Sequence, residues 1–164
     1  MDEMGPLATI PRGGRSWGRK SARRSSRYHK SNTIQLLAAF APRTGRGVGL
    51  SHSNKRAEDV LGFLQTKLLP EFAAYGKIYL IWDNFSSHRK ALKLWNPKPP
   101  NIEFVWTPTN ASWLNLIEPW FLALEKTALH NTDLKTTAEI ADHLRQGIEY
   151  LNDQNRPYQW RKKI

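Results

Sequence analysis

The sequence contains no cysteine, and it has no apolar run long enough to cross a membrane. The first absence excludes disulfides and thiolate metal sites and suits a reducing compartment. The N-terminus also lacks the apolar stretch of a secretory signal, so we expect a soluble, cytoplasmic protein. A chain of 164 residues has the size of one domain. We therefore expect residues 1–164 to form a single domain with a substantial core.

Acidic residues are scarce: 14 Asp and Glu stand against 25 Lys and Arg, which gives a net charge of +11. This excess indicates an anionic polymer as partner, because bound cations release the counterions of a phosphate backbone. Residues 12–30 form a basic insertion or arm without any acid, and its candidate DNA-binding residues are Arg12, Arg15, Arg19, Lys20, Arg23, Arg24, Arg27 and Lys30. Two interpretations stay open, a solvated tail and an arm that contacts nucleic acid.

The first half of the chain contains patterns of strand and helix. "TIQLLAAF" (residues 33–40) and "GVGLSHS" (residues 47–53) flank a turn with Pro and Gly, and they predict an antiparallel hairpin. Apolar residues then recur at helical spacing over residues 57–68. This spacing predicts a helix that ends or kinks at Pro70.

The most hydrophobic stretch, "KIYLIWDN" at residues 77–84, ends on a carboxylate. An uninterrupted apolar run is typical of a strand covered on both faces, so Ile78–Trp82 is predicted as a central strand with Asp83 at its carboxyl end. A short helix over residues 87–95 leads to a second strand, Ile102–Trp106. Such a crossover implies parallel strands, and ligands collect outside their carboxyl ends.

Two more helices are predicted in the last third of the chain. The first carries an apolar stripe over residues 113–124, and Glu118 lies beside that stripe. The second begins with a capping box formed by Thr136 and Glu139.

Asp83 and Glu118 each have an ordinary structural interpretation. Asp83 could cap the turn after its strand, and Glu118 could belong to a capping box with Asn115 as N-cap. Together they favour a site, because the crossover brings the helix of Glu118 near the sheet edge where Asp83 lies. Carboxylates with water and phosphate oxygens suit Mg²⁺ or Mn²⁺. Phosphodiester chemistry uses such ions in pairs about 3.5 to 4 Å apart.

Two long motifs, "WDNFSSH" (residues 82–88) and "TPTNASWLNLIEPWF" (residues 107–121), resemble the catalytic core of DDE superfamily transposases and endonucleases. The resemblance is to the mariner type, and in particular to the bacterial insertion sequence 630 family. The 34 residues between Asp83 and Glu118 match the spacing of that superfamily's second and third acids. "MDEMGP" at the start is similar to the family's first motif, so the resemblance extends over essentially the whole chain.

The resemblance implies an α/β, ribonuclease-H-like fold, with a mixed five-stranded sheet flanked by helices and its first three strands antiparallel. It also implies three catalytic acids that bind two Mg²⁺ or Mn²⁺ ions, namely Asp2, Asp83 and Glu118. Residues that match the motifs and are expected to support the site are Asn84, His88, Asn110, Trp113 and Asn115. By itself, His88 is expected to be a surface or packing residue of its helix and not a ligand.

The function implied is cleavage and strand transfer of an insertion sequence, commonly at a TA dinucleotide, by a homodimer or larger synaptic assembly on nucleoid DNA. Only Met1 precedes Asp2, and no helix-turn-helix module is present. We therefore expect a domain truncated at its amino end, with its first strand largely missing, that alone cleaves DNA poorly. The alternatives are a non-catalytic DNA-binding remnant and an RNA-processing nuclease on the same fold.

Overall fold

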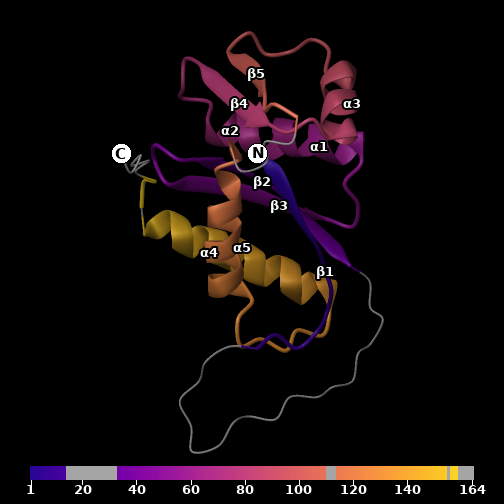
Figure 1. Ribbon diagram of the computed structural model, residues 1–164, viewed down its shortest axis with the longest axis vertical. Coiled ribbons are helices and arrows are strands. Elements are labelled where there is room, and N and C mark those ends of the chain that lie inside the picture. Colours follow the sequence, from indigo (N-terminus) through magenta and orange to yellow (C-terminus); the bar gives the residue numbers. More distant parts are fainter. Residues whose placement is uncertain (14–32, 110–113, 155, 159–164) are drawn as a thin grey trace, which may run out of the picture.

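Three antiparallel strands form one sheet in the computed structural model, which describes residues 1–13, 33–109, 114–154 and 156–158 (Figure 1). The strands are β1 (Asp2–Leu7), β2 (Ile34–Ala41) and β3 (Arg46–His52), and they pair in the order β1-β2-β3. The register of β2 and β3 runs from Gln35 opposite His52 to Ala41 opposite Arg46. The predicted hairpin is confirmed.

Two parallel strands form a second sheet. β4 (Ile78–Trp82) and β5 (Ile102–Trp106) have the predicted bounds, and α3 (Ser86–Leu94) connects them. They pair in register from Ile78 opposite Ile102 to Trp82 opposite Trp106. The crossover that the sequence predicted is therefore confirmed, and both strands end at the same edge of their sheet.

The predicted first helix is divided into three segments. α1 (Ala57–Phe63) continues as a π-helix, η1 (Leu64–Leu68), and then as the short α2 (Leu69–Glu71). Pro70 lies in α2, and the wider π-helix before it accommodates the proline ring.

The last two helices are α4 (Ile117–Ala128) and α5 (Thr137–Asp153). The side chain of Thr136 accepts a hydrogen bond from the N–H of Glu139 at 3.1 Å, so the predicted cap is present. In the described ranges, no helix is long and apolar enough to span a membrane.

Strand β2 separates two hydrophobic cores. Its alternate side chains point to opposite faces, with Leu37 and Ala39 in one core and Leu36 and Ala38 in the other. The first core also takes residues from α1, α3, β4 and β5, and the second takes residues from α4 and α5. β2 is consequently buried on both faces and is the centre of the fold.

The five strands lie in two sheets, where a single five-stranded sheet was expected. The sheets meet where the Met1 amine donates a hydrogen bond to the carbonyl of Ile81 at 2.8 Å. The expectation that the first strand is largely missing needs correction, because β1 extends over six residues. Residues after Asp2 build it by pairing with β2, from Asp2 opposite Ala38 to Leu7 opposite Ile34. The prediction of a missing strand considered only Met1, which precedes Asp2, and not the residues that follow Asp2.

Strand β4 is covered on one face only, although its apolar run predicted cover on both. Leu80 and Trp82 are buried, whereas Tyr79 is 58% and Ile81 47% exposed. Helices α4 and α5 pack against β2 and β3. In the part of the chain that the structure describes, no helix covers the outer face of β4.

Gly47 of β3 offers a test of how tightly the second core is packed. A Cβ on Gly47 would lie 2.2 Å from Cζ2 of the buried Trp120, so Gly47→Ala should lower the free energy of unfolding by about 1 to 3 kcal/mol. Gly62 of α1 has nothing within 4 Å of such a Cβ. The control Gly62→Ala should therefore raise stability by about 0.5 to 1 kcal/mol. Urea unfolding measures both, and equal effects would contradict this packing.

Candidate active site

Asp83 lies at the carboxyl end of β4, where the chain turns into α3. Its Oδ1 accepts a hydrogen bond from the N–H of Phe85 at 3.0 Å, so the carboxylate caps this turn. The side chain is still 41% exposed. The capping interpretation is thus correct, and it leaves part of the carboxylate open to solvent.

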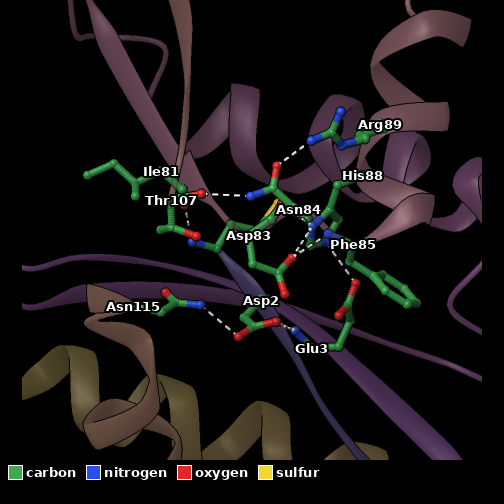
Figure 2. A network of polar contacts seen from close by, with 11 residues as sticks. Asp2, Glu3, Ile81, Asp83, Asn84, Phe85, His88, Arg89, Thr107 and Asn115 are labelled. Carbon is green, nitrogen blue, oxygen red and sulfur yellow. Dashed lines mark hydrogen bonds and ion pairs between the residues drawn. The ribbon is translucent and has the colours of Figure 1, made fainter. Parts of the chain in front are cut away.

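The His88 imidazole joins Asp83 to a second acid from another sheet (Figure 2). His88 lies in α3, and its Nδ1 is 2.9 Å from Oδ1 of Asp83. Its Nε2 is 2.8 Å from Oε1 of Glu3, which belongs to β1. The ring is fully buried. His88 is therefore a packing residue, as one interpretation had it, but it is not on the surface.

The surroundings of His88 favour its charged form. Burial lowers the pKa of the imidazole, but the hydrogen bond to Glu3 and the negative charges of Glu3 and Asp83 outweigh burial, so the pKa is raised above its usual value. The hydrogen bond of Nε2 is to the Glu3 carboxylate, and that of Nδ1 is to the backbone carbonyl of Asp83 at 3.4 Å. Both oxygens only accept, so both ring nitrogens carry a proton. The buried charge is thereby compensated on both sides.

Asp2 is held by two hydrogen bonds at the start of β1. Its Oδ1 accepts from the N–H of Glu3 at 2.8 Å, and its Oδ2 accepts from the Nδ2 amide of Asn115 at 2.7 Å. Burial raises the pKa of the Asp2 carboxyl to about 6, and the charges of Glu3 and Asp83 add to this rise against the opposing effect of the Glu3 N–H. The site therefore disfavours a second negative charge beside Asp83.

The carboxylates of Asp2 and Asp83 point toward one another across the junction of the two sheets (Figure 2). The charge of Asp83 contributes to the raised pKa of Asp2, which is consistent with their proximity. Two facing carboxylates supply the hard oxygen ligands that Mg²⁺ and Mn²⁺ prefer. These two residues fit a divalent ion, which would also relieve their mutual repulsion.

Glu118 does not join this pair. It is exposed in the first turn of α4, which begins one residue after its N-cap Leu116. Asn115, the predicted N-cap, uses its side chain to contact Asp2 instead. Among the described residues, no group of three His, Asp or Glu is placed to hold a metal ion. Asn115 brings the start of α4 to the site through its contact with Asp2, but Glu118, the third predicted acid, is not part of the site.

The other predicted residues divide into those that the structure describes and those outside it. Asn84 donates to the carbonyl of Thr107 at 2.7 Å and so connects the ends of β4 and β5. Arg12 forms an ion pair with Glu125 of α4 at 2.9 Å. The predictions that lie outside the described residues are Asn110, Trp113, Arg15, Arg19, Lys20, Arg23, Arg24, Arg27 and Lys30.

Sequence reasoning overlooked Glu3. Its side chain is only 7% exposed, so it is a buried acid that needs a partner, and His88 is that partner. The signal was present in the adjacent acids Asp2 and Glu3, because neighbouring residues of a strand point to opposite faces. Asp2 therefore contacts Asn115 on one side of β1, and Glu3 contacts His88 on the other.

Comparisons with known proteins give one match. A family model described as DDE superfamily endonuclease matches residues 1–141, which is most of the chain. The search of curated proteins gives no match, and neither does the search of solved structures. The matched range includes Asp2, Asp83 and Glu118.

The raised pKa of Asp2 predicts a pH-dependent effect of Asp2→Asn. The folded protein binds this proton more tightly than the unfolded chain, so the wild type loses stability as pH rises from about 4 through about 6. Asp2→Asn should match the wild type near pH 4 and exceed its free energy of unfolding by about 2 kcal/mol near pH 7.5. Denaturant unfolding at both pH values, without divalent ions, measures this difference.

Asp142 serves as a control, because the pKa of its carboxyl is shifted in the opposite direction to that of Asp2. Its hydrogen bond with Arg145 lowers the pKa of the carboxyl, so its contribution is present at neutral pH and is lost in acid. Asp142→Asn should therefore be the less stable protein near pH 7.5 and approach the wild type as pH falls. A gain in Asp2→Asn that does not change with pH would contradict the assignment.

Proposed function

The chain belongs to the DDE superfamily endonuclease family, and from that premise we propose that it is a transposase catalytic domain that cleaves and transfers DNA strands with the help of divalent metal ions. The observation that carries the proposal is the approach of Asp2 and Asp83 from two sheets at the carboxyl end of β4. Parallel strands collect ligands at this end. The excess of cations in the sequence suits DNA as substrate.

We assign the metal ligands to Asp2 and Asp83, and we propose Glu118 as the third. The support for Glu118 is that Asn115, three residues before it, already contacts Asp2. A bound Mg²⁺ or Mn²⁺ pair would supply Lewis-acid stabilisation of the attacking and leaving oxygens. The chain's own residues hold the carboxylates: Asn115 and the Glu3 N–H hold Asp2, and the Phe85 N–H holds Asp83.

The finer identity that we propose is a mariner-type transposase of the bacterial insertion sequence 630 family. It rests on the motifs at residues 82–88 and 107–121. With it we propose TA dinucleotides as targets, a homodimer or synaptic assembly as the working form, and cytoplasmic DNA as its location. We also propose weak activity for this chain alone, which is supported by the finding that no three acids or histidines among the described residues are placed together to hold a metal ion.

A second candidate function is DNA binding without catalysis. The observation that favours it is again the placement of Glu118, because a site with two carboxylates lacks one of the three expected ligands. Binding through Lys and Arg weakens steeply with salt and needs no divalent ion. Metal dependence therefore separates the two functions.

Nicking of supercoiled plasmid DNA tests catalysis directly. The wild type should nick slowly in Mg²⁺ or Mn²⁺ and not in chelator, and Asp83→Asn should reduce the rate at least about 100-fold, because it removes a ligand charge. Glu118→Gln should do the same. Glu149→Gln is the matched control, since Glu149 is an exposed acid of α5 that pairs with Arg145. Equal nicking by Asp83→Asn and wild type would refute the proposal, and no nicking by any of them would favour the binding function.

The basic arm has its own test in the salt dependence of DNA binding. If Arg23 and Arg24 each neutralise one phosphate, the double variant Arg23→Ala/Arg24→Ala should lower the slope of log K against log salt by about 2. Arg12→Ala is the comparison, because its guanidinium pairs with Glu125 and should leave the slope unchanged. Fluorescence anisotropy over a salt series measures both slopes. An unchanged slope in the double variant would mean that these two residues do not contact DNA.

A further inference from the structure

His88 forms a buried bridge that the proposed function does not use. Its Nε2 contacts Oε1 of Glu3 at 2.8 Å and its Nδ1 contacts Oδ1 of Asp83 at 2.9 Å. Glu3 is almost completely buried, whereas the Asp83 side chain is 41% exposed. The bridge therefore runs from a fixed acid in the interior to an acid at the surface.

Aromatic contacts fix the plane of the His88 ring. Trp82 stacks on it, with ring centroids 5.0 Å apart and an angle of 14° between the planes. Phe85 meets it edge to face at 5.7 Å. With Glu3 holding the far nitrogen, the ring has little freedom to turn, and the direction of its Nδ1 toward Asp83 is determined.

The ring in turn restricts the Asp83 carboxylate. The terminal torsion of an aspartate is broad and has no strong preference of its own. Here Oδ1 is held by both His88 and the Phe85 N–H, so Oδ2 lies on the side of Asp2 (Figure 2). We propose that His88, anchored by Glu3, is a positioning residue that keeps Oδ2 of Asp83 turned toward Asp2, where a divalent ion would bind. This inference rests on the proposed metal site.

Two substitutions of His88 separate positioning from packing. Counted in bonds from Cα, the amide nitrogen of asparagine occupies the same place as Nδ1 of histidine. The amide nitrogen of glutamine occupies the same place as Nε2 of histidine. His88→Asn can therefore keep the bond to Asp83, and His88→Gln can keep only the bond to Glu3. Both lose the stacking on Trp82, so a purely structural role would make them equivalent.

Mn²⁺ affinity of the full chain, measured by electron paramagnetic resonance titration, is the first readout. Loss of a residue that orients a metal ligand typically costs 10- to 100-fold in affinity. We expect His88→Gln to weaken Mn²⁺ binding about 100-fold, and His88→Asn, which keeps the contact with Asp83 but loses the Glu3 anchor, only about tenfold. Equal affinities in the two variants, whether lowered or unchanged, would overturn the proposal.

A second readout needs no metal. In protein labelled with ¹³C at aspartate carboxyls, the Asp83 resonance should move further in His88→Gln than in His88→Asn, because only the asparagine keeps the contact with Asp83. If the wild type binds no Mn²⁺, the proposed metal site fails, and this resonance alone decides whether His88 orients Asp83. A resonance that moves equally in both variants, or in neither, would overturn the positioning role.

Glu3→Ala keeps the proposal testable if a His88 variant does not fold. This change removes the anchor but leaves the His88–Asp83 contact and the stacking in place. Glu3→Ala should weaken Mn²⁺ binding about tenfold. This effect would have to pass through His88, because the imidazole ring lies between Glu3 and Asp83. Unchanged Mn²⁺ affinity would show that Glu3 does not act through His88.

Discussion

The contact of one buried imidazole with two carboxylates holds the two halves of this fold in register. Glu3 belongs to the three-stranded sheet, Asp83 follows the two-stranded sheet, and His88 of α3 bridges them. Only one backbone hydrogen bond, from Met1 to Ile81, is described between the sheets in the part of the chain that the structure covers. Breaking a buried ion pair by removing one partner costs about 3 to 5 kcal/mol. The relative position of the sheets therefore depends on charge as well as on apolar packing.

The same junction gives the site its electrostatic character. Asp2 and Asp83 face each other because β1 and β4 meet there, and burial keeps the pKa of Asp2 near 6. On the other side of β1, the positive charge of His88 faces Glu3 and Asp83. His88 thus compensates negative charge on one side of the strand. On the Asp2 side the Met1 amine lies near both carboxylates, but burial lowers the pKa of this amine to about 6 and weakens its compensation at neutral pH. This is the side where a cation is proposed to bind.

The local elements were predictable from sequence because their signals are local. β4, β5 and the crossover helix follow from apolar runs of strand length separated by Pro-rich and polar segments, and the structure has them within one residue. The exposure of Tyr79 and Ile81 was not predictable, since the cover of a strand depends on where distant helices pack. The likeness of the motifs predicted Asp83 and Glu118 together, but it could not show that Glu118 is exposed in the first turn of α4.

The partnership of Glu3 and His88 illustrates a limit of a different kind. The two residues are 85 positions apart, and each alone has an ordinary role, one on a strand and the other on a helix. Only the burial of both makes the pairing necessary, because neither charge is stable in the interior without the other. The adjacent acids Asp2 and Glu3 indicate that the two side chains face opposite sides of a strand, but only the fold shows that the Glu3 side is buried against His88.

The stacking of Trp82 on His88 has an optical consequence. A protonated imidazole in contact with an indole quenches its fluorescence by electron transfer, and here the ring centroids are 5.0 Å apart and the ring planes nearly parallel. Trp82 is buried beside the carboxylate pair and also stacks on Trp106. The emission of this cluster is therefore sensitive to the ionisation state of the site, so the protein carries an intrinsic chromophore that reports events at the junction of its sheets without any added label.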